Sequence, residues 1–200
     1  GRTGEWFAMD HYDIVPDIMT LAKGIASSYI PFGAVAVSAE INAPFESGET
    51  HFIHGFTNGG HPLGCAAGSE LIDIIRDENL LENCRKQSEV LFSYREQLLA
   101  HPTVRDVRGW GLMMVLELIK DKESIDFFDS SLQAEKLYSA ITLKHGLVMY
   151  GSLYGPRRQA AFKRGLPSWI SPPLTISGEE MHDLVGRLDN ALSEWESIVL

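Results

Sequence analysis

The stretch PDIMTLAKGIASSYIPFGAVAVS, residues 16–38, places a single lysine, Lys23, at the end of an apolar run. Apart from the aspartate in its second position, no other side chain of the stretch is charged. The apolar runs 18–22 and 34–37 predict two buried strands, because strands with helices on both faces of their sheet read as continuous apolar segments. We therefore expect part of an α/β sheet here, with Lys23 at the start of the connection between the strands.

Lys23 is the first candidate for chemistry. A lysine at the carboxyl end of a buried strand lies where open α/β sheets bind their ligands. Partial desolvation favours the neutral amine, which attacks a carbonyl carbon to form a Schiff base. The alternative is a lysine that merely extends from a strand end into solvent, and spacing alone favours this alternative.

The segment HGFTNGGHP, residues 54–62, is the second candidate. Pro62 suits the first turn of a helix. Backbone N–H groups ahead of a helix, together with the hydroxyl of Thr57, can hold an anion such as a phosphate. The alternative is a plain turn with a helix cap, because the segment matches neither a P-loop nor a dinucleotide-binding glycine motif.

A basic cluster in the segment YGPRRQAAFKRGLPSWISPPL, residues 154–174, is the third candidate. A guanidinium on such a loop could bind a substrate carboxylate or sulfonate through two parallel hydrogen bonds. A solvated basic loop or a subunit contact is the alternative for each of its cations. These cations are Arg157, Arg158, Lys163 and Arg164.

The remaining sequence divides by pattern. Residues 1–60 predict part of an α/β sheet, with a loop at 39–54. Residues 60–100 predict a helical connector with a break near 77–79, and residues 101–200 predict a smaller α/β unit.

Within the smaller unit, residues 104–119 predict two strands joined by a turn. A helix ended by Gly146 and two short strands, at 147–150 and 169–174, are expected next. Ser177 and Glu180 form a capping box that opens the last helix.

Composition excludes several classes of protein. The formal net charge is −10, which argues against nucleic-acid binding. No apolar run reaches the roughly 18 residues of a membrane helix, and no secretory signal is visible. The two cysteines, Cys65 and Cys84, and the histidines show no metal-ligand spacing, so we expect buried free thiols in a reducing, cytoplasmic setting. The sequence opens on GRTGEWF, with no element leading into this turn, which indicates a fragment.

Taken in order, these segments resemble the class III aminotransferases, which are pyridoxal-phosphate enzymes acting on ω-amino groups. The resemblance rests on DIVPDIMTLAKGI, PFGAVAVS, HGFTNGGHPLGCAAG, VRGWGLMMVLEL and SPPL, and it runs through nearly the whole chain. It implies PLP fold type I, an α/β fold. Residues 1–100 would be part of the large mixed-sheet domain with its helical connector, and residues 101–200 the small C-terminal α/β domain.

The resemblance also implies roles for individual residues. Lys23 would hold pyridoxal 5'-phosphate as a Schiff base and later move the proton. Thr57 would bind the phosphate of the cofactor in the neighbouring subunit of a homodimer or tetramer, with backbone help at Phe56. The family's substrate-binding arginine falls at Phe162 here, which leaves Arg164 as the candidate nearby. The implied partners are an amine donor, of the taurine or β-alanine type, and a keto acid such as pyruvate.

Other readings stay open at this point. The family's aspartate that pairs with the pyridine nitrogen, its upstream phosphate loop and its stacking aromatic residue are not in this sequence, so we expect the isolated chain to be a poor catalyst. One alternative is a non-catalytic fold-type I remnant that serves as an assembly piece. Another is a phosphate-binding module built on GFTNGG.

Overall fold

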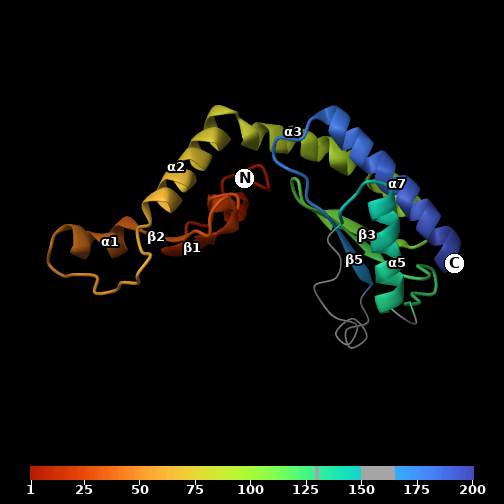
Figure 1. Cartoon of the computed structure of the whole chain (residues 1–200), viewed down its shortest axis with the longest axis horizontal. Coiled ribbons are helices and arrows are strands. Elements are labelled where there is room, and N and C mark those ends of the chain that lie inside the picture. The colour runs from red at the N-terminus through yellow and green to blue at the C-terminus, as the bar shows by residue number, and fades with distance from the viewer. Residues whose placement is uncertain (129–130, 150–164) are drawn as a thin grey trace. The chain divides into compact units, whose positions relative to one another are not determined.

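The computed structural model describes residues 1–128, 131–149 and 165–200 (Figure 1). The chain forms two compact units. Unit 1 comprises Gly1–Trp6 and Leu81–Leu200, and unit 2 comprises Phe7–Leu80. The predicted domain boundary at residue 100 stays a prediction.

The described elements have the following bounds. They are η1 (Ala8–Tyr12), β1 (Ile18–Ala22), η2 (Lys23–Ile25), β2 (Gly33–Val37), α1 (Ala39–Glu46), α2 (Pro62–Asp77), α3 (Leu80–Ser93), α4 (Arg95–Ala100), β3 (Val104–Gly109), β4 (Met114–Leu118), α5 (Ser131–Lys144), β5 (Leu166–Ile170) and α7 (Gly178–Val199).

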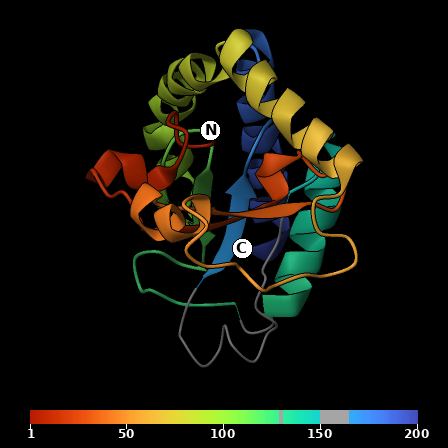
Figure 2. The ribbon, with the colours of Figure 1, turned by 90° about the vertical axis from the view of Figure 1, so that its left-hand side faces the viewer.

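In unit 2, β1 and β2 form a two-stranded antiparallel sheet in which Ile18 pairs with Val37 (Figure 2). The prediction of two strands is confirmed, but the prediction that they are buried is wrong. Ile18 is 58% exposed and Val35 is 63% exposed. A two-stranded sheet leaves its faces open unless another layer packs on it, and Ala26 and Leu80 are the buried hydrophobic residues of this unit.

Helix α1 occupies part of the segment that we expected to be a loop. The hydroxyl oxygen of Ser38 accepts a hydrogen bond from the backbone N–H of Ile41 at 3.4 Å, which caps the new helix. Pro44 lies inside α1. Since proline removes a helical N–H donor, its presence weakened the helical pattern, although the capping serine was a signal for a helix start.

The predicted helical connector, with its break near 77–79, consists of three helices, α2, α3 and α4. Pro62 begins α2 as predicted, and the preceding His61 caps it by accepting a hydrogen bond at Nδ1 from the N–H of Gly64, at 3.2 Å. The predicted break falls at Asn79, which has a left-handed backbone with φ 53°. None of the described helices is both long enough and apolar enough to span a bilayer.

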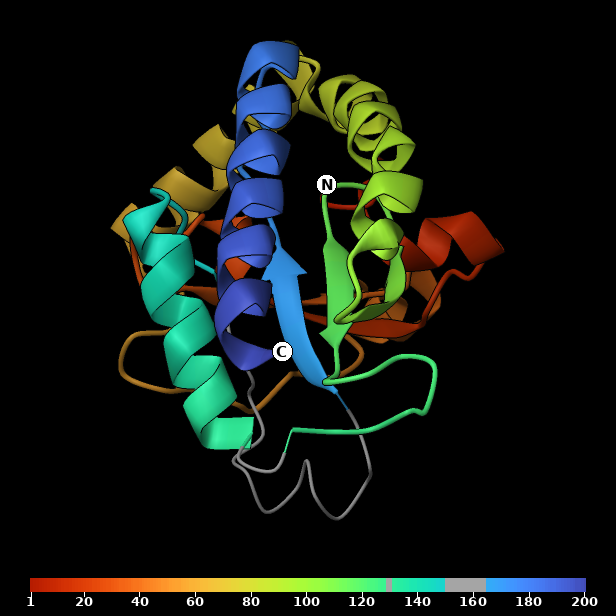
Figure 3. The same cartoon turned by 90° about the vertical axis from the view of Figure 1, so that its right-hand side faces the viewer.

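Unit 1 is built on an antiparallel sheet with strand order β3-β4-β5 (Figure 3). The strand–turn–strand prediction for 104–119 is confirmed. The strand expected at 169–174 instead spans Leu166–Ile170, because Pro172 and Pro173 cannot donate to a sheet. The strand expected at 147–150 does not form at 147–149, and residue 150 lies outside the described residues.

Helices α5 and α7 lie on one face of this sheet (Figure 3). Gly146 ends α5 as predicted: with φ 80° it lets the N–H groups of Gly146 and Leu147 bond to Leu143 and Thr142, a Schellman motif. The capping box is also confirmed, because the N–H of Glu180 donates to Ser177 Oγ at 3.2 Å and the N–H of Ser177 donates to Glu180 Oε2 at 2.8 Å.

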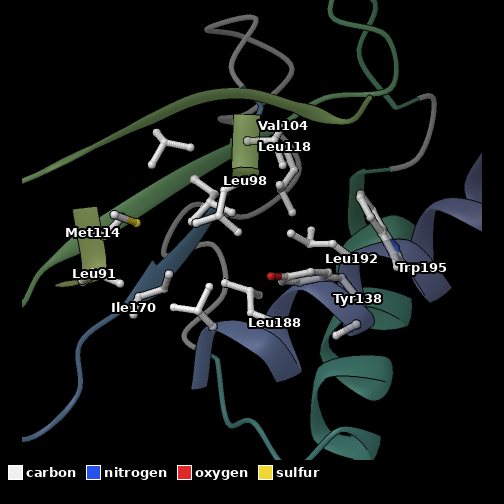
Figure 4. Packing of buried hydrophobic residues seen from close by; sticks show 14 of the residues in the cluster. Leu91, Leu98, Val104, Met114, Leu118, Tyr138, Ile170, Leu188, Leu192 and Trp195 are labelled. Carbon is white, nitrogen blue, oxygen red and sulfur yellow. The ribbon is translucent and has the colours of Figure 1, made fainter. Parts of the chain in front are cut away.

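The hydrophobic core of unit 1 lies between the sheet and these helices (Figure 4). Trp195 on α7 is fully buried, its ring centroid lies 5.3 Å from that of Tyr138 on α5, and its indole N–H donates to the carbonyl of Ala134 at 3.2 Å. Met114 and Leu118 on β4 point into the same cluster, as expected for alternate residues of a strand. This core gives unit 1 a packed interior of its own.

The opening turn of the chain belongs to unit 1. The N–H of Leu112 donates to the carbonyl of Arg2 at 2.9 Å, and the thiol of the buried Cys84 lies 3.2 Å from the same oxygen. The Arg2 guanidinium donates to the carbonyls of Leu112 and Pro172, and burial lowers its pKa. Cys65 is exposed, so the expectation of two buried thiols holds only for Cys84.

Candidate functional site

Lys23 immediately follows β1 and begins the single turn η2, where the sequence pattern places it. Lys23 is exposed, so the partial desolvation expected from the sequence is not found in this chain. In the described part of the chain its ammonium has no hydrogen-bond or ion-pair partner. A Cβ built on Gly24 would meet no atom within 4 Å. The amine is therefore not committed to any described group.

The backbone around Lys23 is strained. Lys23, Ser27 and Ser28 have left-handed conformations, with φ of 54°, 47° and 62°. Such conformations cost a residue other than glycine of order 1 kcal/mol or more, and they concentrate at functional sites. Hydrogen bonds from the N–H of Ala26 to the carbonyl of Lys23, at 3.2 Å, and from Tyr29 to Ala26, at 3.0 Å, hold the turn in this form.

Helix α2 positions this connection through small residues. A Cβ on Gly64 would lie 2.7 Å from Phe32 Cδ2, and a Cβ on Gly68 would lie 3.0 Å from Phe32 Cε1 and 3.4 Å from the carbonyl oxygen of Ile25. The Phe32 ring therefore occupies the space that larger residues on α2 would fill. Sequence reasoning did not single out these residues, although the GCAAG run on a helix was a signal for a close contact.

The second candidate segment, residues 54–62, ends at Pro62, the first residue of α2. A turn forms there, with the N–H of Gly59 donating to the carbonyl of Phe56 at 2.9 Å. Gly60 has φ 64°, a conformation that glycine adopts readily. Thr57 is exposed, and in the described part of the chain the N–H groups of Thr57 and Asn58 have no partner. A hydroxyl and N–H groups of this kind, in a turn ahead of a helix, can hold an anion such as a phosphate.

Aromatic rings form a row that approaches this turn. The ring centroids are 5.8 Å apart for Phe45 and Phe52, 5.5 Å for Phe52 and His54, and 6.1 Å for His54 and Phe56. Phe52 is 72% exposed and Phe56 is 69% exposed. The row lends order to a segment that has no helix or strand.

The structure thus brings the Lys23 connection and α2 into contact, whereas no described hydrogen bond or ion pair joins Lys23 to Phe56 or Thr57. Separately, Lys23 offers an amine that can react with a carbonyl carbon, and the Thr57 turn offers a hydroxyl and N–H groups that can hold an anion. Arg164, like Arg157, Arg158 and Lys163, lies outside the described residues.

Comparison with known proteins bears on this chemistry. The family model for class-III aminotransferases matches residues 1–192. The chain belongs to the class-III aminotransferase family. This family is dependent on pyridoxal phosphate, and the aminotransferase from Vibrio fluvialis whose PMP-bound form has been solved is similar to this chain, with 28% identity and a TM-score of 0.83 over 100% of this chain and 42% of that one.

Curated relatives of this class-III aminotransferase chain are similar along its length. A putrescine–pyruvate aminotransferase of Pseudomonas aeruginosa is 35% identical over 100% of this chain and 41% of its own length. A diaminobutyrate–2-oxoglutarate transaminase of Halomonas elongata is 35% identical over 97% of this chain and 40% of its own length. The chain therefore spans about two fifths of the length of the curated relatives it matches.

Solved structures establish the fold as PLP fold type I. The (S)-enantioselective omega-transaminase from Thermomicrobium roseum is 36% identical, with a TM-score of 0.82 over 98% of this chain and 41% of that one. A transaminase from a study of directed evolution by ancestral reconstruction is 32% identical, with a TM-score of 0.85 over 100% of this chain and 42% of that one. The fold predicted from the sequence is confirmed.

Proposed function

We propose that the complete protein carrying this chain transfers an amino group from an ω-amino acid or amine to a keto acid such as pyruvate, with pyridoxal 5'-phosphate as cofactor. The observation that carries the proposal is the exposed amine of Lys23, which has no partner among the described residues, in a chain of class-III aminotransferase sequence. The relatives' names support the substrate class, since putrescine, diaminobutyrate and gamma-aminobutyrate each carry a terminal amino group. A taurine-like or β-alanine-like donor is part of the same proposal.

Lys23 has two roles in this proposal. Its Nζ would hold the carbonyl carbon of the cofactor covalently, with loss of water, which lysine can do and arginine cannot. Once released by the substrate amine, the same Nζ would act as the base that takes the proton from the carbon bearing the amino group and as the acid that returns a proton within the same half-reaction. When bound, the cofactor supplies a carbonyl for the exchange and a ring that delocalises the electrons of the deprotonated carbon.

The turn at residues 56–58 would bind the cofactor's phosphate. The Thr57 hydroxyl and the N–H groups of Thr57 and Asn58, which have no partner among the described residues, would donate to phosphate oxygens. We assign this phosphate to the neighbouring subunit of a homodimer or tetramer, consistent with the lack of any described contact between Thr57 and Lys23. Because Lys23 is exposed here, the water-excluding walls of the site come from the rest of the polypeptide or from that neighbour.

The experiment uses the complete protein and its Lys23→Ala variant. Pyridoxal phosphate should give the unmodified protein a yellow colour, and borohydride should then attach the cofactor to the peptide containing Lys23. Lys23→Ala should lose both properties together with turnover. The matched control is Lys86→Ala, at an exposed lysine of α3.

Two outcomes would reject the proposal. Retained turnover in Lys23→Ala would remove the role of Lys23. A complete protein that stays colourless, with no covalent attachment after borohydride, would favour the non-catalytic assembly piece.

A further inference from the structure

The turn between α4 and β3, residues 101–103, is held to α7 by a compact polar cluster in unit 1. The ring nitrogens of His101 lie within hydrogen-bonding distance of two carboxylates: Nδ1 is 2.8 Å from Glu196 Oε2, and Nε2 is 3.1 Å from Asp189 Oδ1. Asp189 and Glu196 lie about two helical turns apart, on the same face of α7. The His101 and Glu196 side chains are only 10% and 9% exposed.

This geometry determines the protonation state of the ring. A carboxylate oxygen accepts hydrogen bonds and does not donate them, so each ring nitrogen of His101 must carry a proton to make its contact. Neutral imidazole has only one N–H and would turn a lone pair toward one of the carboxylates. Only the imidazolium satisfies both contacts at once.

Neighbouring groups also donate hydrogen bonds to both carboxylates. Glu196 Oε1 accepts hydrogen bonds from the N–H and the hydroxyl of Thr103, at 3.0 and 2.6 Å. Asp189 Oδ1 also accepts a hydrogen bond from Gln97 Nε2 at 3.0 Å. Both carboxylates are therefore also bound by donors from α4 or from the turn.

We propose that His101 is a pH-sensitive latch, which as an imidazolium between Asp189 and Glu196 fastens the C-terminal half of α7 to the turn that starts β3. This property is independent of the proposed transamination, since unit 2 holds Lys23 and Thr57. Deprotonation of the ring removes one of the two contacts and leaves a lone pair facing a buried carboxylate.

The positive charge of a nearby lysine disfavours protonation of the His101 ring. Lys122, from the segment after β4, donates from its Nζ to the carbonyls of His101 and Leu99, at 2.9 and 2.7 Å. Its charge lies on the backbone side of His101, whereas the two carboxylates contact the ring directly. The carboxylates dominate: the hydrogen bond to Glu196 is the largest influence on His101, burial opposes it, and the net effect raises the pKa of His101 above 6.5.

The pH range over which this cluster stabilises the chain follows from the directions of the two pKa shifts, that of His101 and that of Glu196. A histidine with a raised pKa adds stability that is complete below its ordinary value of 6.5 and is lost as pH rises through its folded value. Burial alone would raise the pKa of Glu196, but the hydrogen bonds from His101 and Thr103 outweigh burial and lower it below 4.5. Glu196 therefore adds stability above that value, and the latch is strongest between about pH 4.5 and 6.5.

The direct test observes the His101 ring by nitrogen-detected NMR in the full 200-residue chain. The latch requires two protonated ring nitrogens at about pH 6 and a titration midpoint above the ordinary value. His101→Gln assigns the signals, and Glu196→Gln should lower the midpoint. A ring with one unprotonated nitrogen at about pH 6, or a midpoint at or below the ordinary value, would overturn the proposal.

Thermal unfolding between about pH 6 and pH 9 gives a second readout. The melting temperature of the unmodified chain should fall by about 2–4 °C more than that of His101→Gln, which cannot titrate. His182→Gln, on the exposed side of α7 where it contacts the Tyr94 hydroxyl, should keep the unmodified slope. An equal fall in His101→Gln would overturn the latch, and if that variant does not fold, the NMR titration of the unmodified chain decides.

Discussion

The hydroxyl oxygen of Tyr138 on α5 lies 2.8 Å from the hydroxyl oxygen of Ser168 on β5, and both residues are buried. Burial raises the pKa of Tyr138, so the phenol keeps its proton. Through this pair, a covering helix is bonded to the edge strand of the unit 1 sheet.

Tyr138→Phe should destabilise the chain. It leaves the buried Ser168 hydroxyl without a partner, which costs about 1–3 kcal/mol, measurable by chemical denaturation. Adding Ser168→Ala to this variant should recover part of the lost free energy of unfolding, because the unpaired hydroxyl is then removed. Tyr94→Phe, which breaks the surface contact with His182, should change the free energy of unfolding by less than about 0.5 kcal/mol. An unaltered free energy in Tyr138→Phe would show that the buried pair is not formed.

Two glycines should respond oppositely to alanine. Gly111 has φ 61°, and its Cβ would lie 2.2 Å from the backbone oxygen of Arg2, so Gly111→Ala should destabilise unit 1 strongly and displace the opening turn. Gly186 lies within α7 with no atom within 4 Å of a built Cβ. Gly186→Ala should stabilise the chain by about 0.5–1 kcal/mol. Thermal melts of both variants test this, and loss of stability in Gly186→Ala would contradict it.

The N-terminal cap of α7 should be measurable by mutation and by pH. Ser177→Ala should cost about 0.5–2 kcal/mol. Hydrogen bonds from the backbone and side chain of Ser177 lower the pKa of Glu180, so its contribution is complete above its ordinary pKa and is lost as pH falls through the lower folded value. Denaturation at about pH 6 and about pH 3 should show this loss, and Glu180→Gln should weaken it. Equal acid sensitivity in Glu180→Gln would contradict the assignment.

Hydrogen exchange should distinguish the two units of the isolated chain. Amides of β3, β4 and β5 should be protected, because they border a packed core. Amides of β1 and β2 should exchange faster, because unit 2 buries few apolar residues. In the complete protein, protection of β1 and β2 should rise. Equal protection in both settings would mean that nothing further covers this sheet.

Lys23→Arg should be as damaging as Lys23→Ala in the complete protein. A guanidinium stays protonated and cannot form the covalent bond, so turnover should fall by at least about 100-fold. Lys86→Arg is the matched control and should retain normal steady-state kinetics. Substantial turnover in Lys23→Arg would show that positive charge, rather than amine chemistry, is what this position supplies.

Several helix ends were predictable from local signals in the sequence. Pro62, Gly146 and the Ser177–Glu180 box each mark a helix end through their own backbone or side-chain chemistry, and the structure has all of these ends where they were expected. The continuous apolar runs around Lys23 also predicted strands correctly. Family resemblance then assigned the fold that the comparisons establish.

Burial was not predictable in the same way. An apolar run shows that a strand can be covered, but what covers it depends on segments distant in the sequence, so the exposure of Ile18, Val35 and Lys23 could not be foreseen. Position after a strand identified Lys23, whereas the support from Phe32 and the α2 glycines required coordinates. The roles of Lys23, Phe56, Thr57 and Arg164 remain proposals.

The opening turn is part of unit 1 although Phe7–Leu80 separates it from the rest of that unit. Unit 2 is therefore, in topological terms, an insertion whose two ends both return to the same body. A protease that cuts once within Phe7–Leu80 leaves the N-terminal piece without a covalent link to the rest of unit 1; the contacts that hold it include those of Arg2 with Leu112 and Pro172 and of Arg85 with Gly4 and Glu5. The nicked protein would then behave as a non-covalent complex, stable only while such contacts persist.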